Sequence, residues 1–208
     1  EGARALSLRE VARAAGVSHT ASYRHFPSKE SLFAAIAEQG FHWLLDMMQR
    51  SAQASGDDHL ARLRACGVAY VEFGVRYPEH LQIMFGGLVG RPDEHPSLMQ
   101  AAKAAYDLLA STVRAALQSG QARGPDERIV TLAAWALVHG LTHLIAGGQI
   151  RVDPQRPLNP RDLAQQVTML FLQGIANPPT PVATDGRSTR RASKDGATSA
   201  SRKHSSRA

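Results

Sequence analysis

The chain has 208 residues, of which 43% are apolar, and it contains one cysteine. That length and composition suffice for one or two domains with a sizeable buried core. No uninterrupted apolar run reaches about 18 residues, so we expect neither a membrane span nor a membrane partner. The single Cys66 excludes a disulfide framework and indicates a cytoplasmic protein, and we expect it to be a small core residue rather than a redox sensor.

The net charge of +6 is distributed unevenly along the chain. Residues 1–29 carry five basic and two acidic side chains, residues 30–176 carry twelve and fourteen, and residues 177–208 carry seven and two. The formal charges of these three segments are therefore +3, −2 and +5. A basic start followed by a nearly neutral middle is typical of a DNA-binding head attached to a regulatory body.

Two short helices joined by a turn are predicted within residues 7–26, SLREVARAAGVSHTASYRHF. Ser7 and Glu10 have the spacing of a capping box, in which each side chain bonds the backbone N–H of the other residue. Gly16 stands where the first helix must end, a position that favours a left-handed backbone. The second helix is expected over residues 19–24 and is too polar for a core helix. This is the layout of a helix-turn-helix, whose second helix enters the DNA major groove.

The pattern of this segment continues into the next helix. The sequence L-x-x-V-A-x-x-A-G-V-S-x-x-x-x-Y-x-H-F-x-x-K-x-x-L, from Leu8 to Leu32, resembles the DNA-binding signature of the TetR family of transcriptional regulators. The resemblance implies three kinds of DNA contact. The residues that face the major groove are His19, Thr20 and Tyr23, and those that bind phosphates are His25 and Lys29. Arg9 contacts DNA near the edge of the site. Lys29 also has a physical rationale, because the free N–H groups of a helix N-terminus attract phosphate.

Members of that family carry a helix before this motif, and the present sequence starts where that helix should end. We therefore expect a head truncated at its N-terminus, with several apolar side chains exposed that the helix would cover: Leu6, Leu8, Val11, Val17 and Phe26. Such a head would bind DNA poorly. A dimeric binding module that has lost DNA binding is therefore one alternative interpretation of the chain.

Beyond the motif the sequence predicts one helix after another, with no convincing strand-like alternation. Helices are expected over residues 28–54, 58–77, 79–85, 96–119, 126–146 and 160–176, with Ser28 and Asp57 as caps and Pro125 in a first turn. The fold class is therefore all-α. We expect a helix-turn-helix domain over residues 1–41, a helical effector-binding and dimerisation domain over 42–176, and a disordered basic tail over 177–208.

Aromatic and methionine side chains gather on the middle helices in greater number than a minimal bundle needs. Such side chains are the usual lining of a small-molecule cavity, although each could also be simple core packing. Trp135, His139 and Gly140 resemble the feature for which one subgroup of TetR C-terminal domains is named, and residues 73–86 resemble the same subgroup. We expect the effector to be small and apolar, in a pocket formed by Trp43, Met47, Tyr70, Phe73, Phe85, Tyr106, Trp135 and His139.

The main alternative to a regulator is a helical metal-binding protein or enzyme that uses His139 and His143. Two histidines four residues apart on a helix can ligate zinc. No acidic residue lies between them as in H-E-x-x-H, and no cysteine or carboxylate cluster completes a site. No Ser-His-Asp, Cys-His or paired-carboxylate arrangement is visible either. We therefore expect no metal, no cofactor and no enzymatic activity.

The last two long helices have wide apolar faces, and two such helices from each subunit can form a four-helix dimer interface. The residues concerned are Ile129, Leu132, Ala136, Leu137, Leu163, Val167, Leu170 and Phe171. The sequence therefore predicts a cytoplasmic homodimer that binds a palindromic operator in double-stranded DNA as a repressor. A small-molecule effector would release it by shifting the population of its conformations.

Overall fold

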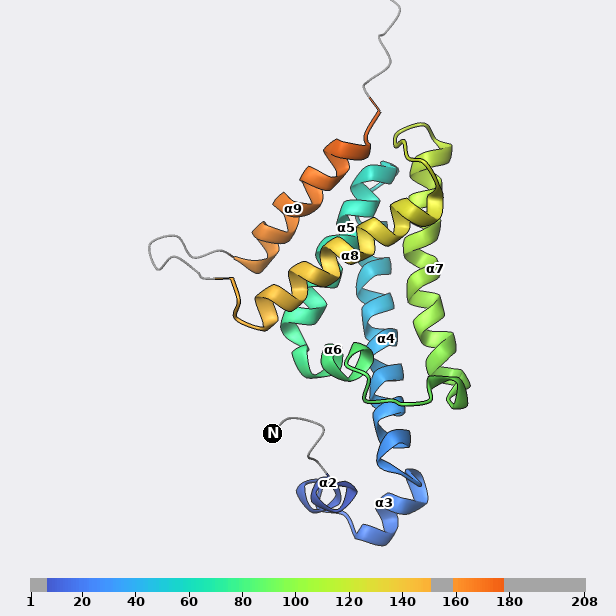
Figure 1. Ribbon diagram of the computed structural model, residues 1–208, viewed down its shortest axis with the longest axis vertical. Coiled ribbons are helices and arrows are strands. Elements are labelled where there is room, and N and C mark those ends of the chain that lie inside the picture. Colours follow the sequence, from blue (N-terminus) through green and yellow to red (C-terminus); the bar gives the residue numbers. More distant parts are fainter. Residues whose placement is uncertain (1–6, 151–158, 178–208) are drawn as a thin grey trace, which may run out of the picture. The chain divides into compact units, whose positions relative to one another are not determined.

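A computed structural model of the chain describes residues 7–150 and 159–177 (Figure 1). These residues form helices, apart from connecting segments and one isolated antiparallel bridge between Ala122 and Ala176. The helices are α2 (Leu8–Ala14), α3 (His19–His25), α4 (Lys29–Gln53), α5 (His59–Arg76), α6 (Pro78–Phe85), the 3-10 helix η1 (Pro92–Glu94), α7 (Pro96–Gln118), α8 (Glu127–Ala146) and α9 (Pro160–Ile175). The predicted all-α fold class is confirmed for this part of the chain.

The described residues all belong to the first of the two units into which the chain divides, and the tail predicted from the sequence lies outside the described residues, apart from Asn177. Within the first unit, α4 runs without interruption through the predicted boundary between residues 41 and 42. One continuous helix thus belongs to both the predicted head and the predicted body.

The helices of the head begin and end where the sequence indicates. The Ser7 hydroxyl accepts from the N–H of Glu10 at 3.2 Å, and the Ser7 N–H donates to the Glu10 carboxylate at 2.8 Å, which completes the capping box before α2. The Ser7 hydroxyl also donates to the Glu10 carboxylate at 2.8 Å, and this bond together with that from the Ser7 N–H lowers the pKa of Glu10, because both favour its charged form. Gly16 follows with a φ of 69°, the left-handed conformation expected of it. Ser28 caps α4, also as predicted, with Ser31 as its partner.

Two predicted helix starts in the body are wrong by one residue. Asp58, not Asp57, caps α5 by accepting from the backbone N–H groups of residues 60 and 61, while Asp57 forms an ion pair with Arg62 at 2.9 Å. Asp126 caps α8, which places Pro125 before the helix instead of in its first turn. In both places two residues that can begin a helix stand next to each other in the sequence.

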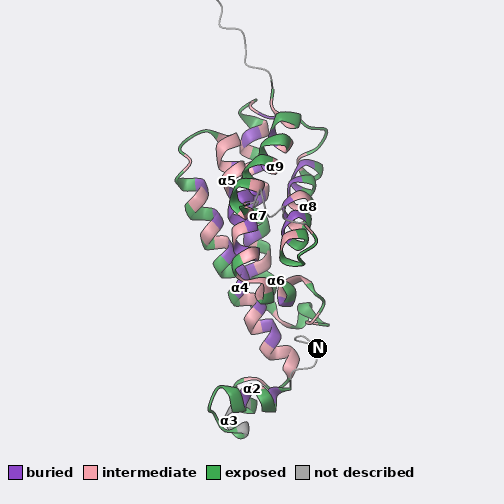
Figure 2. Ribbon diagram, turned by 90° about the vertical axis from the view of Figure 1, so that its left-hand side faces the viewer, coloured by how far each residue is buried: buried purple, intermediate pink, exposed green. Residues whose placement is uncertain are grey.

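The core of the body is built around α5, which contacts α4, α7, α8 and α9. A helix surrounded on several sides must be apolar over most of its circumference, and the buried residues of α5 include the uninterrupted run from Cys66 to Val71. Cys66 is fully buried, as predicted, and burial raises the pKa of its thiol to about 11. Figure 2 shows buried residues where the helices of the body face one another, whereas α2 and α3 are largely exposed.

Helix α8 is long and apolar enough, by length and composition, to cross a membrane. The helix contains no uninterrupted apolar run of about 18 residues, because polar side chains occur along it, so the sequence criterion did not identify it. The same two properties are common in helices that pack inside a protein, and α8 packs against α5, α7 and α9. It approaches α5 closely at Gly74, where an added Cβ would lie 2.2 Å from Cγ2 of Thr142.

Candidate DNA-binding surface and effector cavity

Helices α2 and α3 pack against each other and expose the side chains that the sequence analysis assigned to DNA contact. Arg9 is exposed in the first turn of α2, and Thr20, Tyr23 and His25 are exposed on α3. His19 is the first residue of α3, but its side chain lies outside what the structure describes. The last turn of α3 is basic and its first turn contains no acidic residue, so the helix favours a negatively charged partner.

Lys29 is the first residue of α4 and is half-buried. Its ammonium group lies 5.3 Å from the centroid of the Phe33 ring, a distance typical of a cation–π contact. The neighbouring carboxylate of Glu30 accepts a hydrogen bond from the backbone N–H of Arg91 at 2.8 Å. One turn of α4 therefore joins the predicted phosphate contact to the connection between α6 and α7.

The apolar residues around the α2–α3 turn line an open groove together with His25 and Leu32. Val17 is 49% exposed, as expected, and Val11 and Phe26 are half-buried. Leu8 is only 6% exposed, so its predicted exposure is wrong. It shares one face of α2 with the buried Ala12. Leu6 lies outside the described residues.

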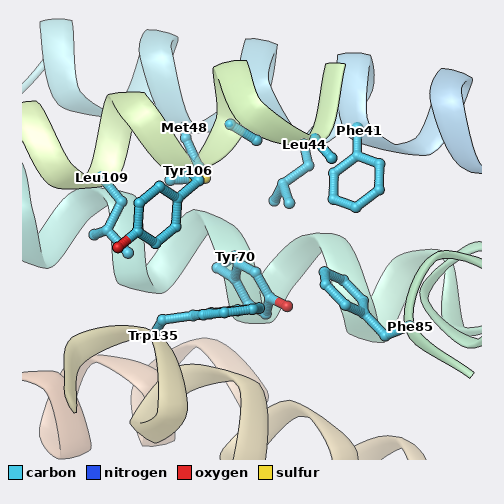
Figure 3. Close-up of a pocket in the computed structure, with 10 residues that line it drawn as sticks. Phe41, Leu44, Met48, Tyr70, Phe85, Tyr106, Leu109 and Trp135 are labelled. Carbon is cyan, nitrogen blue, oxygen red and sulfur yellow. The ribbon is translucent and has the colours of Figure 1, made fainter. Parts of the chain in front are cut away.

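A cavity of about 130 Å³ lies inside the body between five helices (Figure 3). Four residues that the sequence analysis placed in the effector pocket line it: Tyr70, Phe85, Tyr106 and Trp135. The rings of Phe85 and Tyr106 lie 6.1 and 6.3 Å from the ring of Trp135, centroid to centroid. The remaining wall comes from residues that the sequence analysis missed: Phe41, Leu44, Met48, Ala102, Ala105 and Leu109.

The missed residues follow a helical spacing that residue type alone did not reveal. Residues 41, 44 and 48 of α4, and residues 102, 105, 106 and 109 of α7, are mostly three or four apart, so each set shares one face of its helix. The apolar periodicity of both helices could have identified these faces. The two alanines matter because small side chains on a wall leave space between larger ones.

Three residues predicted for the effector pocket lie elsewhere. Trp43 is 37% exposed, and its ring contacts Tyr77 and His80 at centroid distances of 5.2 and 4.9 Å. Met47 packs at the edge of the core, and Phe73 is fully buried within it. None of the three is on the cavity wall.

His139 lies behind the wall and contacts two residues that form it. Its Nδ1 is hydrogen-bonded to the Tyr70 hydroxyl at 2.7 Å, and its ring lies edge-on to Phe85 at 4.8 Å. Its Nε2 is 3.1 Å from Nε2 of His143, which is exposed. Burial, and secondarily the nearby His143, lower the pKa of His139, so the ring is neutral near pH 7. In the part of the chain that the structure describes, no third His, Cys, Asp or Glu joins this pair in a metal-binding group.

Helices α8 and α9 expose large apolar side chains. Leu170 is 68% exposed, Ile129 54% and Leu132 53%. Ala136 is also exposed, and the other residues predicted for the dimer face are half-buried: Leu137, Leu163, Val167 and Phe171. Contiguous exposed apolar side chains of this size are typical of protein interaction surfaces.

Comparison with known families explains why these features occur together. Residues 1–36 match the family described as bacterial regulatory proteins, tetR family, and residues 63–169 match the tetracyclin repressor-like C-terminal domain. The chain belongs to the TetR family. It is therefore a DNA-binding, ligand-responsive transcriptional regulator with a helix-turn-helix head. Membership of a family of transcriptional regulators does not favour the metal-binding or enzymatic alternative.

Solved structures of similar proteins agree with this assignment. The TetR-family chain is 32% identical to a Rhodococcus protein of unknown function, with a TM-score of 0.70 over 83% of this chain and 86% of the other. The TetR-family regulator PfmR from Thermus thermophilus and the ketosteroid transcriptional regulator KstR2 of Mycobacterium tuberculosis have the same fold. PfmR is 20% identical, with a TM-score of 0.66 over 82% of this chain and 90% of PfmR. KstR2 is also 20% identical, with a TM-score of 0.64 over 85% of this chain and 87% of KstR2.

A curated relative resembles part of this TetR-family chain in sequence. The nucleoid occlusion factor SlmA of Marinobacter nauticus is 30% identical over 113 residues, which are 54% of this chain. The match spans about half of SlmA, 56% of its length.

Proposed function

We propose that this TetR-family regulator is a homodimeric repressor that a small apolar ligand in the α4–α8 cavity releases from its operator. The observation that carries the proposal is the path of α4. The helix begins at Lys29, beside the predicted DNA contacts, and further along contributes Phe41, Leu44 and Met48 to the cavity wall. A ligand that changes the packing of those three side chains acts on the helix that supports the head.

Contacts between α4 and the neighbouring connection support the same coupling. The Glu30 carboxylate holds the backbone of Arg91, and the Ser97 hydroxyl donates to the carboxylate of Glu38 at 2.7 Å. Phe85, at the end of α6, lines the cavity just before this connection. The ligand favours the conformation in which it binds best, and by reciprocity operator DNA disfavours ligand binding.

Operator recognition is assigned to the head. In this proposal Thr20, Tyr23 and His19 face the major groove, His25 and Lys29 bind phosphates, and Arg9 contacts the edge of the site. Exposure of Arg9, Thr20, Tyr23 and His25 supports the assignment. The head comprises residues 1–41, the effector-binding and dimerisation domain residues 42–176, and the basic segment 177–208 adds sequence-independent attraction to DNA.

Dimerisation is assigned to α8 and α9, on the basis of the exposed Ile129, Leu132 and Leu170. A two-fold dimer presents two copies of α3, which requires half-sites about 34–36 Å apart and a palindromic operator.

The protein acts in the cytoplasm, where its DNA is. The cavity serves binding rather than catalysis, because its wall offers no acid–base pair or nucleophile arrangement.

The proposal is tested by selecting bound duplexes from a random pool with the full chain and measuring affinity by fluorescence anisotropy at several salt concentrations. We expect a palindromic consensus and binding at least about a thousandfold tighter than to random duplex. Equal affinity for all duplexes would contradict sequence-specific regulation. Undiminished operator binding at saturating cavity ligand would contradict release by the ligand.

A further inference from the structure

The Tyr70 hydroxyl forms a buried polar end of the cavity, whereas the other lining tyrosine, Tyr106, is 42% exposed. Tyr70 is 5% exposed, and Figure 3 shows its hydroxyl between Phe85 and Trp135. Behind it, Nδ1 of His139 lies 2.7 Å away, and Nε2 of His139 lies 3.1 Å from Nε2 of His143. A continuous row of three hydrogen-bonding side chains therefore runs from the cavity wall to the exposed His143.

A tyrosine hydroxyl has one hydrogen to donate and two lone pairs that accept. The bond to His139 uses one of these three positions and the neighbouring Trp135 side chain uses a second, so one position remains for a ligand. Whether that position is a donor or an acceptor depends on which nitrogen of His139 carries the proton. A ligand hydroxyl suits both cases, because it can donate and accept, whereas a carbonyl suits only one.

The size of the cavity limits the ligand. An engineered cavity of roughly 150 Å³ with a Leu, Ile and Phe wall binds benzene, so the 130 Å³ of this cavity corresponds to about one six-membered ring. The wall contains no charged side chain, and burial disfavours the charged form of His139 behind it. An ion without a partner is strongly disfavoured in such surroundings, so a carboxylate on the ring would prevent binding.

We propose that the cavity selects a neutral compound of about one ring with one hydroxyl group, and that Tyr70 bonds this hydroxyl while His139 positions the Tyr70 side chain. The inference rests on the proposed function, in which this cavity binds the effector. Tyr70 is the specificity residue, and His139 acts through it.

Calorimetry with phenol, toluene and benzoate tests the proposal on the full chain. Phenol and toluene have nearly the same shape and differ in the hydroxyl, so each variant is compared with the unchanged protein for both probes. Tyr70→Phe should weaken phenol binding about fivefold and leave toluene binding within about twofold, as expected for one lost hydrogen bond. Benzoate should bind at least about a hundredfold more weakly than phenol.

Tyr77→Phe is the matched control, since Tyr77 lies outside the cavity wall and should change neither probe. His139→Leu should lower the affinity for phenol but not for toluene, and His139→Gln, which keeps a hydrogen-bonding group, should restore part of the loss. A purely structural role of His139 would affect both probes alike. Thermal unfolding of each variant verifies that it is folded.

The outcomes separate this inference from the function on which it rests. Equal loss of phenol and toluene in Tyr70→Phe, or benzoate binding as tight as phenol binding, overturns the selectivity while the cavity remains a binding site. If neither phenol nor toluene binds the unchanged protein, the one-ring ligand class is overturned, while the proposed function is still tested by operator selection and by release with other apolar ligands.

Discussion

Met84 of α6 packs so closely on Gly40 of α4 that a Cβ at residue 40 would lie 2.6 Å from its sulfur and 3.2 Å from its Cγ. The next residue after each of them, Phe41 and Phe85, lines the cavity, and these two rings meet edge-on at 5.5 Å. The contact between α4 and α6 is therefore continuous with the cavity wall. Any ligand that separates Phe41 from Phe85 must also change the fit of Met84 on Gly40.

Gly40→Ala should consequently lower the free energy of unfolding by about 0–2 kcal/mol, because overpacking against Met84 exceeds the roughly 1 kcal/mol by which alanine is favoured over glycine inside a helix. Denaturant unfolding measures the loss. Met84→Ala removes the obstructing atoms, so the double variant should be more stable than the sum of the two single changes predicts. Simple additivity of the two changes would show that the methyl group acts elsewhere.

Ala105→Leu should make the regulator insensitive to the ligand, because Ala105 is buried on the cavity wall and a leucine there fills the space. We expect operator affinity to become independent of cavity ligand, with a change in unfolding free energy below about 3 kcal/mol. Anisotropy titrations with and without toluene measure the effect. Ala104→Leu, one residue earlier on α7 and off the wall, is the control and should remain responsive.

Leu170→Glu should dissociate the proposed dimer, because it puts a charge into the apolar face of α8 and α9. The residue is 68% exposed in the single chain, so the fold itself should be little affected. Sedimentation velocity should show monomers. Met99→Glu, at another exposed apolar residue, on α7, should remain dimeric, and a Leu170→Glu dimer at the same concentration would refute the assignment of this face.

Lys29→Ala should weaken operator binding by a similar factor for all sequences. It should also reduce the slope of log affinity against log salt by about 1 for each subunit, as expected for a lost phosphate contact. Anisotropy at several salt concentrations gives this slope. Lys103→Ala is the matched control, since that lysine lies on α7 and pairs with Asp107 at 2.5 Å. An unchanged slope in Lys29→Ala would remove Lys29 from the phosphate contacts.

The stability of the body should fall with decreasing pH because of His139. Its pKa in the folded protein lies below the ordinary 6.5, so the unfolded chain binds the proton more readily. The contribution of the neutral ring is complete above pH 6.5 and is lost as the pH falls through this value toward the lower folded pKa. Melting temperatures at several pH values should fall less steeply for His139→Gln than for the unchanged protein, whereas the exposed His42→Gln should match the latter.

The sequence predicts the helices well, because their ends are marked by residues with one dominant effect. Proline opens α6, α7 and α9, and Gly16 ends the first helix of the motif with a positive φ. The adjacent Asp57 and Asp58 could not be distinguished, since both can cap a helix; Asp58 does so, while Asp57 pairs with Arg62 in the first turn of α5. Local chemistry therefore determines where elements begin, within a residue or two.

Only part of the cavity wall was predicted, because aromatic and methionine residues were chosen by type and not by the face of the helix on which they lie. Trp43 and Met47 have the right chemistry but project from α4 away from the wall, whereas Leu44 and Met48 project into it. Which face of a long apolar helix meets a cavity depends on neighbours that are distant in sequence. Ala105 contributes to the cavity because its side chain is small and leaves space beside it. An alanine in the sequence does not indicate whether that space is left empty or filled by a neighbour.

The hydrogen bond from Arg91 to Glu30 uses a backbone N–H on one side and a carboxylate on the other. The bond therefore depends on the type of amino acid at residue 30, but not on the side chain at residue 91. Residue 91 can drift to any amino acid that keeps its N–H, which excludes proline alone, whereas residue 30 must keep an acceptor of the same reach. Related regulators that retain this connection should vary freely at the first position and hardly at all at the second.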